Sequence, residues 1–192
     1  MRCEVARSLN SFPAPPPRSL HLDNGFDLRP AMPADAAVIA GWMKQPHIWR
    51  WWQQDWSVER WVKVLEEQAA GEHSIPCMTA LDGEDLAYVE LYRVRHDRLA
   101  EYYACAEHDW GVHIAIGDTT RVGRGIGRRL LRSLADALLR ADPRCDRAVA
   151  EPDVANTPSV RAFAAAGFET QGELQLPEKT ALLMVRTRTV EA

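Results

Sequence analysis

The spacing of apolar positions predicts helices and strands along most of the chain. Apolar residues three and four apart predict helices over 33–45, 57–71, 126–140 and 157–166. Shorter alternating or continuous apolar runs predict strands over 26–29, 74–81, 86–93, 110–116, 145–151, 168–174 and 180–188. The stretch 47–56 fits neither period. This order of elements predicts a mixed α+β sheet.

Length, charge and cysteine spacing narrow the class of protein. The 192 residues favour one domain, expected over 25–192, behind an N-terminal arm of residues 1–24 whose proline-rich segment predicts flexibility. A net charge of −4 indicates no nucleic-acid partner. Without a membrane-length apolar run or a signal peptide, a cytoplasmic protein with no membrane partner is expected. The four cysteines lack metal-ligand spacing, so no metal is expected.

A glycine-rich segment, 121–131, stands between a predicted strand and a predicted helix. Gly123, Gly125 and Gly127 leave its backbone accessible. A helix that begins here directs its first N–H groups and its positive dipole end into the loop, which favours a phosphate or pyrophosphate. From these residues alone, a tight turn before a core helix is an equally good interpretation.

Two motifs stand at a characteristic spacing in the second half. Residues 122–127 read Val-Gly-Arg-Gly-Ile-Gly, and 156–168 read Asn-Thr-Pro-Ser-Val-Arg-Ala-Phe-Ala-Ala-Ala-Gly-Phe. They resemble the two motifs of the acyl-CoA N-acyltransferase (GNAT) superfamily. The resemblance implies the GNAT fold, a central, mostly antiparallel sheet whose splayed middle strands are parallel and whose faces carry helices. Val122 departs from the usual Gln or Arg, and Phe163 from the Tyr that often protonates the departing thiolate.

Further segments narrow the resemblance to one branch. They are 46–48, 51–52, 90–92, 102–103, 111–116 and 151–157. Together they resemble siderophore-biosynthesis acyltransferases that act on N-hydroxylysine or a related N-hydroxydiamine, over about residues 25–188. Aminoglycoside 6'-N-acetyltransferases share the first two and the last of these segments and are the competing branch. The pair Tyr102–Tyr103 and the segment 111–113 favour the siderophore branch.

The resemblance implies acetyl-CoA or another acyl-CoA as co-substrate. Pantetheine would lie between the splayed strands, and the pyrophosphate would bind to the glycine loop. Backbone N–H groups near 114–116 would polarise the thioester carbonyl. The donor-binding candidates are Ile114, Ala115, Ile116, Arg121, Val122, Gly123, Arg124, Gly125, Ile126, Gly127, Arg128, Asn156, Ser159 and Phe163.

The implied reaction is direct acyl transfer to nitrogen, with His113 and Glu151 as catalytic residues. His113 is the expected general base, because an ordinary imidazole pKa of about 6.5 suits proton removal from a hydroxylamine-type nitrogen. A hydrogen-bonded core histidine is the plainer interpretation. Glu151 is expected to orient the amine or pair with His113, and Asp153 to cap the following helix.

Aromatic residues dominate the expected acceptor pocket. Five of the seven tryptophans lie within 49–61, and Trp61, at helical spacing, is expected in the core. In a strand-like stretch Trp51 and Trp52 would point to opposite sides, so one of them is expected to contact the alkyl chain of the acceptor. The substrate-binding candidates are His47, Trp51, Trp52, Glu90, Tyr102 and Tyr103, and Glu90 is expected to take an amino group.

Three functions remain open. The leading hypothesis is an acyl-CoA-dependent N-acyltransferase of hydroxamate siderophore assembly, acting on a small-molecule amine or hydroxylamine. The second is an aminoglycoside 6'-N-acetyltransferase. The third is a CoA-binding regulatory module without catalysis, which Val122 and Phe163 favour. The sequence leaves open the acyl group, the acceptor and whether the protein is a monomer or a homodimer.

Overall fold

A seven-stranded sheet forms the centre of the protein. The computed structural model describes residues 20–71 and 74–189. The strand order is β1-β2-β3-β4-β5-β7-β6, and only β4 and β5 are parallel neighbours in it. The strands are β1 (Phe26–Pro30), β2 (Ser74–Leu81), β3 (Glu84–Arg93), β4 (Trp110–Ile116), β5 (Arg147–Ala150), β6 (Glu169–Gln175) and β7 (Thr180–Thr187). The predicted mixed α+β sheet is confirmed.

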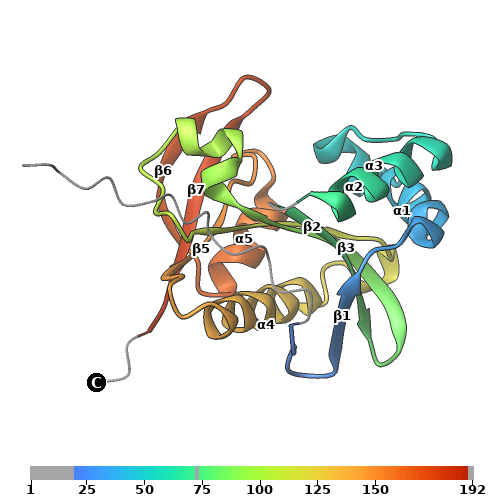
Figure 1. Ribbon diagram of the computed structural model, residues 1–192, viewed down its shortest axis with the longest axis horizontal. Helices are drawn as coiled ribbons and strands as arrows, with labels where there is room; N and C mark the ends of the chain where they lie inside the picture. The colour runs from blue at the N-terminus through green and yellow to red at the C-terminus, as the bar shows by residue number, and fades with distance from the viewer. Residues whose placement is uncertain (1–19, 72–73, 190–192) are drawn as a thin grey trace, which may run out of the picture.

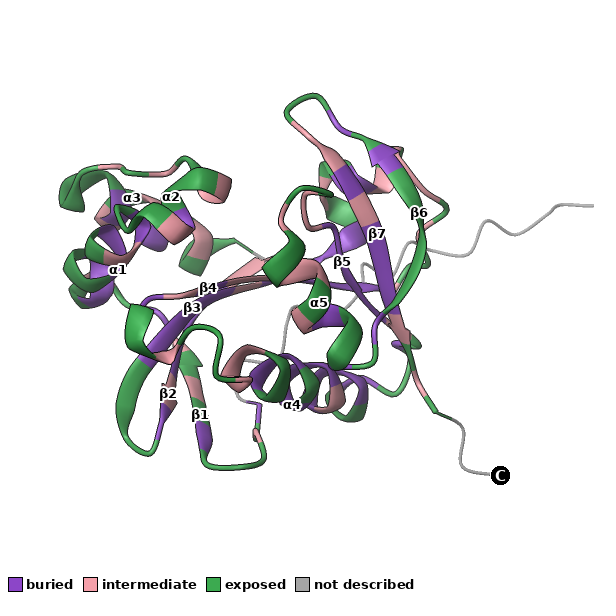
Figure 2. Ribbon diagram, turned by 180° about the vertical axis from the view of Figure 1, so that it is seen from behind, coloured by how far each residue is buried: buried purple, intermediate pink, exposed green. Residues whose placement is uncertain are grey.

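Helices cover both faces of this sheet (Figure 1). They are α1 (Ala36–Met43), α2 (Pro46–Trp52), α3 (Val58–Ala70), α4 (Ile126–Ala141) and α5 (Thr157–Ala165). On one face α1 and α3 pack on Met78 and Tyr88, and Trp61 is fully buried there as predicted. On the other face α4 packs its leucine stripe against the strands, while its outer side is exposed (Figure 2). No described helix has the length and apolarity to cross a membrane.

The stretch 47–56, for which no helix was predicted, begins as helix α2. Pro46 occupies its first turn, where the fixed φ of proline suits a helix and its missing N–H costs nothing. The helix ends at Trp52, and the next residue, Gln53, caps it with a left-handed φ of 51°. Seven residues with aromatic side chains on several sides show no apolar period, so the pattern could not reveal this helix.

The two parallel strands separate after a short contact. β4 pairs with β5 only at Trp110–Ala148 and Gly111–Val149. On its other side β4 is paired with β3 along its whole length, with Glu90 opposite His113. Among the residues that the structure describes, those of β4 after Gly111 therefore have no strand partner on the β5 side, which confirms the predicted splay.

Residues 20–24 lie against helix α4. Leu20 is buried in the main core, and the Asp23 N–H donates a 2.7 Å hydrogen bond to Ser133 Oγ. The packed domain thus begins at least five residues before the expected boundary at residue 25. Residues 1–19 of the expected flexible arm lie outside the described part of the chain.

Candidate active site

A cavity opens where β4 and β5 separate. Its volume is about 420 Å³, and it is enclosed by residues from β3, β4, the end of β5, α2, α5, the short helix η3 (Arg98–Glu101) and the β6–β7 turn. The lining residues are Trp51, Trp52, Gln54, Glu90, Arg98, Val112, His113, Ile114, Ala150, Glu151, Pro152, Asp153, Asn156, Ser159, Phe163, Glu178 and Lys179.

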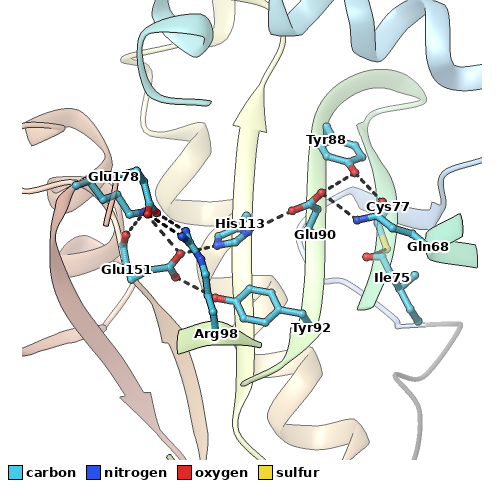
Figure 3. Close-up of polar contacts among 11 residues, drawn as sticks. Gln68, Ile75, Cys77, Tyr88, Glu90, Tyr92, Arg98, His113, Glu151 and Glu178 are labelled. Atoms are coloured by element: carbon cyan, nitrogen blue, oxygen red, sulfur yellow. Dashed lines mark hydrogen bonds and ion pairs between the residues drawn. The ribbon is translucent and has the colours of Figure 1, made fainter. Parts of the chain in front are cut away.

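The imidazole of His113 lies between two carboxylates in this cavity (Figure 3). His113 Nε2 is 2.6 Å from Glu151 Oε1, and Nδ1 is 3.2 Å from Glu90 Oε2. Glu90 in turn accepts hydrogen bonds from Tyr88 Oη at 2.9 Å and Gln68 Nε2 at 3.3 Å. The row thus joins helix α3, strands β3 and β4, and the residue that follows β5.

This arrangement stabilises the charged forms of all three groups. Burial disfavours the imidazolium, but the neighbouring Glu151 and Glu90 carboxylates outweigh it and raise the pKa of His113 to about 10. Burial likewise opposes ionisation of Glu151, yet His113, Lys179 and Tyr92 lower its pKa to about 2. The pKa of Glu90 is also lowered despite its burial. His113 therefore keeps both ring protons at neutral pH, and the expectation of an ordinary imidazole pKa here is wrong.

The phenol of Tyr92 completes the hydrogen bonding of Glu151. Tyr92 Oη donates to Glu151 Oε2 at 2.9 Å, and its ring stacks on His113 with centroids 4.8 Å apart. Tyr92 lies on β3, opposite Gly111 of β4. A Cβ on Gly111 would lie 2.0 Å from Tyr92 Cζ, so only glycine lets this ring pass over β4 to reach Glu151.

The glycine loop before α4 presents backbone N–H groups. Gly123 and Gly125 have φ angles of 76° and 75°, and Gly125 caps α4 without a side chain. Ile126, Gly127 and Arg128 stand in the first turn, where N–H groups have no intrahelical acceptor. Together with the dipole of this sixteen-residue helix, they can hold an anionic group such as a pyrophosphate.

Residues 31–176 match the family described as acetyltransferase (GNAT) domain. The chain belongs to this family. Lysine N-acyltransferase MbtK of Mycolicibacterium paratuberculosis is 37% identical over 172 residues, which cover 90% of this chain and 77% of that protein. N-hydroxyputrescine acetyltransferase of Acinetobacter baumannii is 32% identical over 152 residues, covering 79% and 72%. The structure of AAC(6')-Ib in complex with paromomycin and acetyl-CoA matches with a TM-score of 0.78 and 26% identity, covering 86% and 94%. The chain is therefore a GNAT N-acyltransferase.

Of the three acyl-CoA-binding candidates on β4, two have backbone groups that face the gap between β4 and β5. Gly117 N–H donates to Leu86 O on β3, so by strand alternation the backbone groups of Ile114 and Ile116 face away from β3. Ile116 O hydrogen-bonds His47 Nε2 at 2.9 Å. The backbone of Ala115 faces β3, opposite Tyr88, and its side chain is buried under α1 and α3.

The side chains around the glycine loop divide into two groups. Arg121 forms ion pairs with Glu84 and Asp118, and the Val122 N–H donates to Thr119 O, so both are committed away from the cradle. Arg124 is exposed, and Arg128 Nε lies 3.3 Å from the place of a Gly125 Cβ. A Cβ on Gly127 would lie 3.2 Å from Ile116 Cδ1, so this glycine lets α4 approach β4.

The α5 candidates all line the cavity. Asn156 Oδ1 accepts the Ser159 N–H at 3.3 Å, so Asn156 caps α5. The expected cap, Asp153, instead accepts the Ala155 N–H at 2.7 Å. Phe163 is buried and packs edge-on against Phe168, with ring centroids 5.0 Å apart.

The acceptor candidates separate into lining and non-lining residues. Trp51 and Trp52 both line the cavity. They lie on helix α2, whereas the sequence predicts a strand-like stretch with the two side chains on opposite sides. Glu90 also lines the cavity, and its carboxylate is hydrogen-bonded to His113 there. His47 ties α2 to β4, while Tyr102 and Tyr103 pack in the cluster beside η3, where Tyr103 Oη donates to Asp109 at 3.0 Å.

Several cavity residues carried no sequence signal. Arg98 lies in a segment whose sequence indicates only a charged turn. Glu178 and Lys179 lie in the turn between β6 and β7. Arg98 and Glu178 form an ion pair across eighty positions of sequence. Only the folded sheet brings these side chains to one cavity.

Proposed function

We propose that this enzyme transfers an acyl group, acetyl in the first instance, from acyl-CoA to the hydroxylated amine of N-hydroxylysine or a related N-hydroxydiamine in hydroxamate siderophore biosynthesis. The observation that carries the proposal is the row Glu90–His113–Glu151 beside the gap between β4 and β5. The names of its relatives, which act on lysine and N-hydroxyputrescine, support this acceptor class.

The donor is proposed to enter from the α4–α5 side. The N–H groups of the glycine loop and the side chain of Arg128 would bind the pyrophosphate. The Ile114 backbone and the N–H group of Ile116, whose carbonyl is already bonded to His47, would hold pantetheine. Asn156, Ser159 and Phe163 line the cavity beside this path. These groups fit a CoA thioester, since they supply donors for the phosphates and open strand hydrogen-bonding groups for the amides of pantetheine.

In the proposed reaction, the hydroxylamine nitrogen attacks the thioester carbonyl carbon, so that a C–N bond forms. Such a nitrogen is neutral at pH 7 and needs no prior deprotonation. Once bonded to the acyl carbon it is strongly acidic, and Glu151 accepts its proton while the His113 imidazolium supports the charge. The C–S bond then breaks, and the thiolate leaves and takes up a proton.

The sequence predicts His113 as the general base, whereas we propose that His113 and Glu151 act together as a pair. The 2.6 Å contact lets the two groups share one proton, so the pair can accept the proton of the nucleophile as a unit. Phe163 has no proton for the departing thiolate. Ser159 is a hydroxyl on the same wall of the cavity and is the proposed donor.

The test is thiol release from acetyl-CoA with N6-hydroxylysine, N-hydroxycadaverine, lysine and kanamycin. Turnover of a hydroxylamine with little turnover of kanamycin is the expected result. Preference for kanamycin would instead assign the aminoglycoside function of the structurally similar enzyme. Binding of CoA without thiol release in the presence of any of these acceptors would leave only a regulatory module.

A further inference from the structure

A mixed-charge cluster borders the cavity on the side of η3 and the β6–β7 turn. This head-group cluster consists of Arg98, Glu178 and Lys179, all of which line the cavity. Arg98 forms a two-pronged ion pair with Glu178, in which Nη1 is 2.7 Å from Oε2. Lys179 Nζ donates to the Glu151 carbonyl oxygen at 2.7 Å and lies 3.6 Å from Glu151 Oε1. The cluster therefore adjoins the reacting centre (Figure 3).

Fold stability does not explain why these charges stand here. The side chains of Arg98 and Glu178 are 54% and 44% exposed, and an ion pair this exposed contributes little to the free energy of unfolding. The Lys179 ammonium has three N–H groups, and within the described residues one hydrogen bond is formed by them. The cluster thus keeps donor capacity and charge that a ligand in the cavity can use.

The charges of the cluster complement a zwitterion. Arg98 and Lys179 supply two cations and Glu178 one anion at the same border of the cavity. An α-amino acid carries a carboxylate and an ammonium on one carbon, and charge-assisted hydrogen bonds to such groups are the strong ones. Trp51 and Trp52 line the same cavity and offer an apolar wall for a chain of methylenes.

We propose that the head-group cluster binds the α-carboxylate and α-ammonium of an amino-acid acceptor, so that the enzyme acts on N6-hydroxylysine in preference to an N-hydroxydiamine. The carboxylate binds Arg98 and Lys179, and the ammonium binds Glu178. The four methylenes then reach from this head to the hydroxylated nitrogen beside Glu151. This inference rests on the proposed function and narrows its acceptor class.

The experiment compares two acceptors that differ by one group. N-hydroxycadaverine is N6-hydroxylysine without its carboxylate, and both present the same hydroxylamine to acetyl-CoA. We expect the wild-type kcat/KM to be about tenfold to a hundredfold higher for N6-hydroxylysine, with most of the difference in KM, as loss of one charged contact would give.

Charge reversal separates recognition from a structural role. Arg98→Glu combined with Glu178→Arg keeps an ion pair at the border of the cavity but exchanges the places of the two charges. We expect the preference for N6-hydroxylysine to fall at least about tenfold in this double variant, with thermal stability retained. Arg140→Gln is the matched control, since Arg140 is also an exposed arginine, paired with Asp23 away from the cavity. It should leave the preference unchanged.

Three results would overturn the inference. Equal wild-type kcat/KM for the two acceptors, or an unchanged preference in the double variant, would show that the cluster does not bind the amino-acid head. A wild-type preference for succinyl-CoA over acetyl-CoA with N-hydroxycadaverine, lost in the double variant, would assign the cluster to a carboxylate on the acyl donor. In each of these cases hydroxylamine turnover persists, whereas its absence would contradict the proposed function itself.

Discussion

The ring of Tyr92 passes over Gly111 and delivers its hydroxyl to Glu151, two strands away from its own. Burial and the adjacent Glu151 carboxylate raise the pKa of Tyr92, so the phenol stays a donor. One carboxylate oxygen is thereby occupied, and the other is directed at His113. The orientation of the proposed proton acceptor thus depends on a glycine in the middle of the sheet.

Gly111→Ala is expected to disrupt this contact. Because the new Cβ would lie 2.0 Å from Tyr92 Cζ, the ring must move, and overpacking of this kind costs about 1–3 kcal/mol of folding stability. The Tm, measured by thermal denaturation, and kcat would both fall. Tyr92→Phe separates the two effects, because it keeps the ring and removes only the hydroxyl, so kcat should fall with a smaller loss of stability. An alanine variant with wild-type Tm and kcat would refute the role of Gly111.

Removing either member of the pair His113–Glu151 is expected to abolish most turnover. His113→Ala and Glu151→Gln should each lower kcat about a hundredfold or more, the usual contribution of proton transfer by a positioned group. CoA binding, measured by calorimetry, should persist, since neither side chain belongs to the glycine loop. Near-normal kcat in both variants would end the catalytic assignment.

The stability of the fold is expected to fall as the pH rises above neutrality. The folded state raises the pKa of His113 to about 10 from 6.5, so below pH 6.5 both states hold the proton and the stabilisation is complete. Between about 6.5 and 10 only the folded state holds it, and stability is lost with rising pH. The Tm of the wild type should therefore decline more steeply from pH 7 to 9.5 than that of His113→Gln. Parallel declines would contradict the raised pKa.

At acidic pH the dependence of folding stability on pH has the opposite sign. The pKa of Glu151 is lowered to about 2 from 4.5, so its stabilisation is complete above pH 4.5 and is lost as the pH falls toward 2. Glu151→Gln cannot titrate and should show a shallower loss of Tm over this interval. Scanning calorimetry at pH 6, 4 and 3 provides the comparison, and an equal loss in both proteins would count against the ionised Glu151.

Substitution in the glycine loop should weaken donor binding. Gly125→Ala places a Cβ at a left-handed φ of 75°, which costs about 1–2 kcal/mol and displaces the N–H groups that open α4. We expect the Kd for CoA to rise about tenfold. Gly83→Ala is the matched control, because its φ of 82° is equally strained but lies in the β2–β3 turn. A similar change in Kd for both variants would mean that general strain, and not the loop, was measured.

The sequence predicted those parts of the molecule that depend on local spacing. The leucine stripe of α4 repeats every three to four residues and the strands alternate every two, and these elements appear where expected. Helix α2 does not, because its tryptophans face several sides. The pKa of His113 was out of reach for a different reason. It depends on carboxylates 23 and 38 positions away, and the ordinary value applies only when such partners are absent.

The acceptor side shows the same limit. The concentration of tryptophans predicts that Trp51 or Trp52 contacts the acceptor, but that both line the cavity follows only from their place on helix α2. Arg98 and Lys179 lie in short connections with no motif, and the arrangement of η3 over the β6–β7 turn brings them together. Tyr102 and Tyr103, prominent in the sequence, pack beside η3 instead.

The short contact between β4 and β5 has a consequence for how the protein avoids aggregation. A strand with open hydrogen-bonding groups normally invites another chain to pair with it, and proteins shield such edges at the rim of a sheet. Here the open edge lies at the centre of the sheet, with α2 above it and α5 below, and His47 already occupies the last carbonyl of β4. Because helices flank this open edge, a strand of another chain cannot approach it as freely as it could approach the rim of the sheet. The protein can therefore leave hydrogen bonds open for a ligand at the centre of the sheet and offer them less readily to its neighbours.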